Sequence, residues 1–363
     1  MPVIEKIENW KPGDHNSDTE CYCGVKMPIR AMRIGFAPSW WHTKHGIEFG
    51  EKYVFDPDYR VETVRYKWAE FNRMYPDMNV GASDPEPAVI GINFANAAAA
   101  AAFGCEVIYP VNNYPLARHF ADEDAVMRVK IPEDIENTFP YSEMISQIKY
   151  LNRKLGADRK PGIGKNGILN DAFSLRGDEL FADLAEDNAL GKRMMDMSLQ
   201  FGLDLYDYNE SIGIKGGGIC LANCTAELIG PSMYEDWQLD YDREYAGYAR
   251  KHGGGFVLHH CGDSFDDFIE VYKKLPNPVL VDVAQTAGVR KMLDAFPDSQ
   301  VNIGFLSSWL MAATAADVRA YTERLMEESR GDWQRLSVVV ADLDIYTPES
   351  HIQEVFDTIM RFM

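Results

Sequence analysis

Short apolar runs alternate with longer segments of helical spacing through the second half of the chain, and this rhythm constrains the fold more than any other feature. The spacing predicts strands over residues 256–259, 279–283, 301–305 and 337–340, with helices between them. Strands that are apolar along their whole length are typical of a parallel sheet that helices cover. The number of strand and helix units favours an α/β fold, a closed (β/α)8 TIM barrel, over an open sheet.

The amino-terminal part of the chain lacks this rhythm. Residues 1–60 are irregular and rich in proline, glycine and aromatic residues, so we expect an extension that packs on or over a barrel formed by residues 61–363. Within the barrel, helices are predicted over residues 189–206 and 231–252, and a strand over residues 105–109. The chain is therefore expected to form one large domain with an irregular amino-terminal extension.

The composition argues against several functional classes. The 363 residues carry a formal net charge of −20, whereas nucleic-acid binding depends on Lys and Arg that neutralise phosphates. No run reaches the ~18 to 20 apolar residues of a membrane span, and residues 1–10 are too polar and acidic for a signal peptide. We therefore expect a cytoplasmic protein without a nucleic-acid or membrane partner, whose six cysteines are buried residues or metal ligands.

The segment Phe-Val-Leu-His-His-Cys-Gly at residues 256–262 contains the strongest chemical signal. Alternate residues of a strand point to the same side, so His259 and Cys261 can converge at the strand end while His260 faces away. Zinc accepts nitrogen and sulfur ligands, and a catalytic zinc site uses three protein ligands and keeps one position open. The alternative is a buried cysteine beside a hydrogen-bonded histidine.

Other polar residues follow the predicted strands and are expected at the same mouth of the barrel, where TIM-barrel enzymes place their chemistry. Cys220 and Asn223 follow one strand, Asp282 ends another, and Asp342 and Asp344 follow the last. Cys220 and Asp342 are candidate further metal ligands, and Asp282 and Asn223 are candidate catalytic residues. The alternatives are buried thiols for the cysteines and helix caps for the aspartates.

The sequence Trp40-Trp41-His42 in the amino-terminal segment is a candidate aromatic lid over the barrel mouth. Exposed paired tryptophans suggest contact with something flat and apolar, such as an aryl methyl ether or a corrin face. The alternative is that the pair packs the amino-terminal arm onto the barrel.

Four segments resemble the uroporphyrinogen decarboxylase superfamily and, within it, the cobamide-dependent methyltransferases. The resemblance extends from about residue 40 to the end, and its markers are residues 174–184, 228–234, 258–262 (Leu-His-His-Cys-Gly) and 346–349 (Tyr-Thr-Pro-Glu). It implies a barrel whose zinc binds a thiol as thiolate, which then attacks a methyl group on a corrinoid protein. It is also compatible with a homodimer, because barrels of this superfamily often pair, but the sequence does not determine the oligomeric state.

The chain departs from this family at one position. Methyltransferases that use coenzyme M carry a second cysteine before the Thr-Pro element, and the matching residue here is Ala341. The third ligand would therefore come from one of five other residues, namely Cys220, Cys224, Asp342, Asp344 or Glu227. The function that the resemblance implies is zinc-dependent transfer of a methyl group between a corrinoid protein and a thiol, methyl ether or amine.

Two alternatives remain. The decarboxylase branch places an aspartate under a pyrrole nitrogen, and the residue near the matching position here is Asn96, which lacks the negative charge that a protonated pyrrole needs. Asn96 is nevertheless a candidate for the catalytic site, and Arg30 and Arg33 lie in a segment roughly comparable to the one that binds the acidic tetrapyrrole. The second alternative is a non-catalytic barrel that has lost a metal ligand.

Overall fold

The computed structural model describes residues 4–8, 10, 19–80, 94, 96–120, 122–186 and 189–363. In this part of the chain a seven-stranded sheet has the order β1-β2-β9-β8-β7-β6-β5. Its strands are β1 (Cys21–Tyr22), β2 (Ala31–Phe36), β5 (Ile219–Ala222), β6 (Phe256–His260), β7 (Leu280–Ala284), β8 (Gln300–Gly304) and β9 (Leu336–Leu343).

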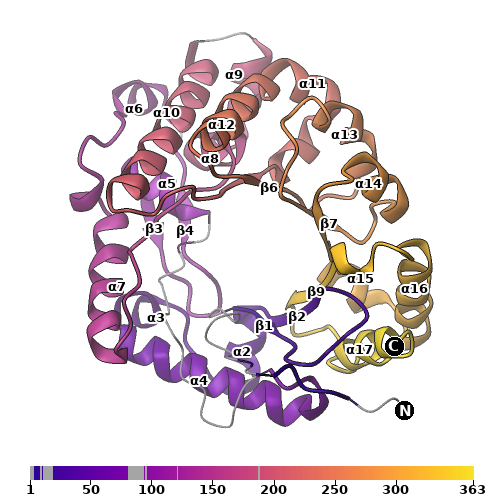
Figure 1. Cartoon of the computed structure of the whole chain (residues 1–363). Coiled ribbons are helices and arrows are strands. Elements are labelled where there is room, and N and C mark those ends of the chain that lie inside the picture. Colours follow the sequence, from indigo (N-terminus) through magenta and orange to yellow (C-terminus); the bar gives the residue numbers. More distant parts are fainter. Residues whose placement is uncertain are drawn as a thin grey trace.

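The sheet is the inner layer of an α/β barrel. All its neighbouring strands pair in parallel except β1, which pairs antiparallel with β2. Figure 1 shows the elements arranged in a ring, with the helices outside the strands. This confirms the predicted α/β fold of the TIM-barrel type.

Helices connect the strands and surround the sheet. They are α2 (Pro38–His45), α3 (Glu51–Phe55), α4 (Pro57–Met74), α5 (Ala97–Ala102), α6 (Glu123–Arg128), α7 (Tyr141–Leu155), α8 (Ile168–Arg176), α9 (Glu179–Ala185), α10 (Ala189–Ser211), α11 (Gly230–Trp237), α12 (Leu239–Lys251), α13 (Phe265–Tyr272), α14 (Val289–Ala295), α15 (Ser307–Ala312), α16 (Ala315–Glu328) and α17 (Ser350–Met360). Short 3-10 helices are η1 (Pro76–Met78), η2 (Ile135–Asn137), η3 (Cys224–Leu228) and η4 (Trp333–Arg335). In the described ranges, no helix is both long and apolar enough to cross a membrane.

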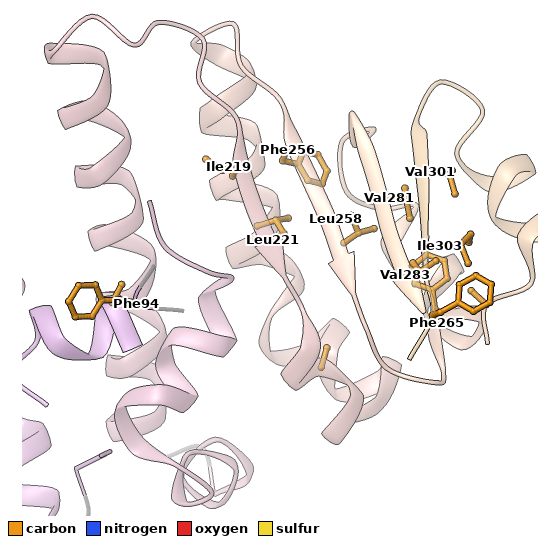
Figure 2. Close-up of a cluster of buried hydrophobic side chains, with 14 of the residues drawn as sticks. Phe94, Ile219, Leu221, Phe256, Leu258, Phe265, Val281, Val283, Val301 and Ile303 are labelled. Atoms are coloured by element: carbon orange, nitrogen blue, oxygen red, sulfur yellow. The ribbon is translucent and has the colours of Figure 1, made fainter. Parts of the chain in front are cut away.

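The strands alternate between an apolar side that faces the helices and a more polar side that faces the barrel interior. The first side is almost fully buried, as Leu258 on β6 and Val281 on β7 illustrate. Figure 2 shows these side chains together with those of the neighbouring strands. The residues next to them, His259 and Asp282, pair in register and are only partly buried. The apolar layer thus fixes the register that brings the polar residues together.

The structure refines three of the predicted elements. Strand β2 lies inside the segment 1–60, so the sheet begins upstream of the expected boundary at residue 61. The strand predicted over residues 105–109 forms β3 (Glu106–Ile108), which pairs with β4 (Leu116–Arg118) in a separate hairpin. The predicted helix 231–252 is divided into α11 and α12 at Gln238, whose buried side chain hydrogen bonds to Asn223.

Candidate metal centre

Three side chains meet where β5 and β6 end. The ligand atoms of Cys224, His259 and Cys261 all lie within 4.8 Å of one another. His259 belongs to β6 and Cys261 follows that strand directly, while Cys224 begins the 3-10 helix after β5. The backbone N–H of Asn223 donates to the carbonyl of His259 at 2.7 Å, which holds the two strand ends side by side. The expected convergence of His259 and Cys261 is therefore present, and Cys224 joins it.

Asp282 orients the histidine of this group. Asp282 is on β7, the strand next to β6, and its Oδ2 lies 2.9 Å from Nδ1 of His259. With Nδ1–H donating to a carboxylate, Nε2 is left as the nitrogen that faces the two cysteines. Such a pairing fixes the tautomer of a metal-binding imidazole and makes it a stronger ligand.

The electrostatics of the group favour a thiolate at Cys224. The hydrogen bond from Cys261 has the largest effect on the pKa of Cys224 and lowers it. Burial raises this pKa and His259 lowers it further, and the net result is a pKa of about 4. Burial lowers the pKa of His259, but hydrogen bonds to Asp282 and Cys224 outweigh burial and raise it to about 10. The bond to Cys224 raises the pKa of Cys261. One sulfur is thus already in the form that binds a metal.

These donors fit zinc. One imidazole nitrogen and two sulfurs are typical zinc ligands, and Zn–S distances of about 2.3 Å place two sulfurs about 3.8 Å apart in a tetrahedral site. That spacing lies inside the 4.8 Å limit that the three ligand atoms satisfy. Three protein ligands leave a fourth position for a substrate, as catalytic zinc sites do. Cys261 is exposed, so this position is reachable from solvent.

Two predicted ligands lie outside the group. Cys220 instead lines a separate cavity of about 200 Å³ with Lys165 and Tyr245, where burial raises its pKa to about 12. Asp342 has a left-handed backbone (φ 54°) beside the point where the β2–β9 register shifts, and burial raises its pKa while Arg33 lowers it. Cys220 and Asp342 were predicted to complete the metal centre, but in the described residues it is Cys224, one of the five candidates, that lies in the group with His259 and Cys261.

The remaining two candidate ligands have other partners. Glu227 accepts a hydrogen bond from Ser264 Oγ at 2.7 Å and lies 2.9 Å from Nε2 of His260, so it holds the turn that follows β6. His260 is buried and also lies 2.7 Å from the hydroxyl of Tyr272, facing away from Cys224 as expected. Asp344 accepts a hydrogen bond from Ser39 at 3.5 Å. These two carboxylates support loops and strand ends.

Asn223 is a structural residue. It is fully buried, its Nδ2 donates to Asp242 at 2.9 Å, and its Oδ1 accepts from Gln238 at 2.8 Å. The hydroxyl of Tyr234 donates to the same carboxylate at 2.7 Å. A side chain enclosed by this network does not reach a substrate, so the prediction of a catalytic Asn223 is corrected. Its role is to hold the end of β5.

The predicted aromatic lid is also corrected. Trp40 and Trp41 are only 2% and 1% exposed, and the ring of Trp40 stacks on Phe36 of β2 at 3.9 Å. His42 lies 2.9 Å from the carbonyl oxygen of Ile47 through Nδ1. Two core indoles and a histidine bonded within its own segment do not form an exposed cofactor surface, so the packing alternative holds.

Two asparagines lie near the metal centre, and of these Asn96 was a predicted catalytic candidate whereas Asn170 was not predicted. Asn170 in α8 helps to lower the pKa of Cys224, and its Oδ1 accepts from the N–H of Thr225 at 3.0 Å. Asn96 lies at the start of α5, where its Oδ1 accepts from Asn166 at 2.9 Å. Both asparagines line a cavity that reaches Cys224. The signal in the sequence that could have identified Asn170 is a polar residue within the apolar start of a helix.

Comparison with known proteins places the chain in a family. The model of the uroporphyrinogen decarboxylase (URO-D) family matches residues 88–361. Among solved structures, a methyltransferase from Methanosarcina mazei is similar with a TM-score of 0.63 and 12% identity, over 97% of this chain and 96% of that one. At this identity the similarity concerns the fold. No curated protein matches the sequence. Because the family model spans most of its length, the chain belongs to the uroporphyrinogen decarboxylase family.

Proposed function

We propose that this protein is a zinc-dependent methyltransferase that moves a methyl group between a small substrate and a corrinoid protein. The observation that carries the proposal is the His259, Cys261 and Cys224 group at the barrel mouth. Cys224, after β5, would supply the sulfur that Ala341, within β9, cannot provide. The site thus has one nitrogen and two sulfurs, with the second cysteine on a different strand end.

The residues of the chain have separable roles in this proposal. Cys224, Cys261 and His259 would hold the metal, and Asp282 would keep the imidazole in the orientation that presents Nε2. Zinc, when bound, supplies a positive charge that deprotonates a thiol or polarises an ether oxygen. Of these three ligands, His259 and Cys261 have raised pKa values and would release protons when the metal binds, whereas the lowered pKa of Cys224 favours a thiolate beforehand.

A corrinoid protein is a macromolecular co-substrate and needs an accessible surface around the metal. Cys261 is exposed, and two large apolar side chains are strongly exposed on segments that follow strands at the same end of the barrel. They are Leu228 after β5, which is 66% exposed, and Tyr346 after β9, which is 70% exposed. Exposed apolar side chains beside a reactive centre are consistent with a partner that covers it.

The decarboxylase alternative has less support. Asn96 offers an uncharged amide that is bonded to Asn166, and Arg33 forms an ion pair with Glu20 at 2.7 Å. An arginine already paired with a carboxylate is a weak recognition group for the acidic side chains of a tetrapyrrole.

Methyl transfer to or from free cobalamin tests the proposal. Zinc-loaded protein is mixed either with methylcobalamin and thiols or with cob(I)alamin and methyl donors, and absorbance reports the cobalt state. We expect catalysis in one direction, at least 100-fold weaker in Cys261→Ala and unchanged in the matched control Cys220→Ala. Complete inertness in both directions despite bound zinc would favour the non-catalytic barrel.

A further inference from the structure

A second feature of the site is a cavity of about 430 Å³ beside Cys224. It is bounded by the β3–β4 hairpin, by α8 and by the start of η3. This volume is in the range of about 300 to 1,000 Å³ that small-molecule sites occupy. Because Cys224 is part of its wall, a molecule bound there lies next to a proposed metal ligand.

Apart from the imidazole of His119 and the sulfur of Cys224, the wall of this cavity is polar but uncharged. Asn113, Asn170, Ser174 and Thr225 supply amides and hydroxyls, and Phe173 and Leu116 supply apolar surface. Of the described residues that line the cavity, none is Asp, Glu, Lys or Arg. The described wall therefore provides hydrogen bonds and apolar contact without a carboxylate, ammonium or guanidinium group.

Charged residues that lie near the cavity-lining residues in the sequence form ion pairs with each other. Arg118 on β4 forms an ion pair with Glu106 at 3.0 Å. Lys165 and Asp171, which follows Asn170 in α8, form a fully buried ion pair at 2.8 Å. These pairs leave the neighbouring charges satisfied, so neither an anionic nor a cationic ligand meets a ready counter-charge here.

The described wall has no carboxylate, ammonium or guanidinium group, and this distinguishes the three kinds of substrate, namely thiols, methylamines and methyl ethers. A thiol that carries a sulfonate or carboxylate would lose hydration without gaining a lysine or arginine partner, and a methylammonium would lose hydration without gaining a carboxylate. An uncharged methyl ether has no charged group whose hydration would be lost on binding. We propose, resting on the methyltransferase function above, that this cavity binds an uncharged methoxyarene, with the ring against Phe173 and the oxygens near the amides and hydroxyls.

The corresponding reaction balances with the corrinoid protein as co-substrate in its Co(I) state. The methyl carbon to oxygen bond breaks, and its electron pair stays on the oxygen, which takes a proton from water to give a phenol. The electron pair of Co(I) forms the new bond to the methyl carbon, so cobalt is formally oxidised to Co(III). The methoxyarene would thus be the methyl donor.

Calorimetric titration of the zinc-loaded full chain tests the cavity separately from catalysis. The probes are 2-methoxyphenol, the anionic thiol 2-mercaptoethanesulfonate, and tetramethylammonium. We expect 2-methoxyphenol to bind at least 10-fold more tightly than either ion. Asn113→Asp keeps the side-chain oxygen that accepts from the N–H of Tyr114 and adds a negative charge to the wall. It should shift the ratio of affinities toward tetramethylammonium at least 10-fold.

Asn112→Asp is the matched control, because Asn112 is exposed, adjacent in sequence and outside the described wall. It should leave the affinity ratios unchanged. Tighter binding of either ion to the wild type, or ratios that Asn113→Asp does not move, would overturn the inference. If 2-methoxyphenol binds as expected but never methylates cob(I)alamin, the cavity assignment stands and the methyltransferase proposal fails. If the sulfonate thiol is methylated while 2-methoxyphenol does not bind, the methyltransferase proposal stands and the cavity assignment fails.

Discussion

His259 Nδ1 and Asp282 Oδ2 lie 2.9 Å apart on neighbouring parallel strands, and this hydrogen bond determines which imidazole nitrogen faces Cys224 and Cys261. The two residues are register partners, so the sheet itself positions the carboxylate. The candidate metal centre is therefore attached to the central sheet rather than to loops alone.

Replacing this carboxylate should weaken metal binding without removing a ligand. Asp282→Asn keeps the shape of the side chain but loses the charge that supports the Nδ1–H donor. We expect zinc affinity to fall by about 10- to 100-fold, or about 1.4 to 2.7 kcal/mol. Competition with a chromogenic chelator measures it. Asp344→Asn, on a carboxylate bonded to Ser39, is the control and should match the wild type.

Asn170 should also affect zinc affinity, through its effect on Cys224. Asn170→Asp preserves the oxygen that accepts from the Thr225 N–H but replaces the amide that helps to lower the pKa of Cys224 with a negative charge. Two negative groups near each other disfavour the thiolate, so we expect zinc affinity to fall by about 10-fold or more. Ser174→Ala, on the same helix and in the same cavity wall, should leave zinc affinity unchanged. Equal affinity in Asn170→Asp and the wild type would contradict the assigned effect on Cys224.

Asn223 should contribute to stability rather than chemistry. Asn223→Leu leaves Asp242 and Gln238 without one buried hydrogen-bond partner each. We expect the free energy of unfolding to fall by about 3 kcal/mol, as measured by urea denaturation. The fraction that stays folded should still bind one equivalent of zinc. Loss of zinc from a variant of undiminished stability would show that Asn223 acts at the metal centre instead.

Glu227 should make stability depend on pH in the acidic range. Burial raises the pKa of this carboxyl, but hydrogen bonds from Ser264 and His260 outweigh burial and lower it below its ordinary 4.5. A carboxyl with a lower pKa in the folded state contributes stability above pH 4.5, and this contribution is lost as the pH falls further. Glu227→Gln should therefore lose less stability than the wild type below pH 4.5. The exposed Glu244→Gln is the control, and urea midpoints at several pH values decide the outcome.

Much of the barrel could be predicted because its strands are apolar on the helix-facing side and short. The runs that became β6, β7, β8 and β9 were located from this pattern alone. β2 was missed because it lies within an irregular segment, and only its pairing with β9 identifies it as a barrel strand. The division at Gln238 was missed because the helical spacing continues across it.

The metal centre could be predicted only in part. His259 and Cys261 are close in sequence, and the two-residue period of a strand brings them together. The choice between Cys220 and Cys224 depends on where β5 ends and on how η3 turns, which spacing does not determine. The burial of Trp40 and Trp41 likewise depends on packing against Phe36, a contact set by the tertiary structure.

Metal content of purified variants tests the central claim most directly. We predict one zinc per chain in the wild type and in the control Cys220→Ala, by mass spectrometry of the dialysed, folded protein. Cys224→Ala, His259→Ala and Cys261→Ala should each retain less than a tenth of that amount. A full equivalent of zinc in folded Cys224→Ala, or its loss from Cys220→Ala alone, would contradict the account.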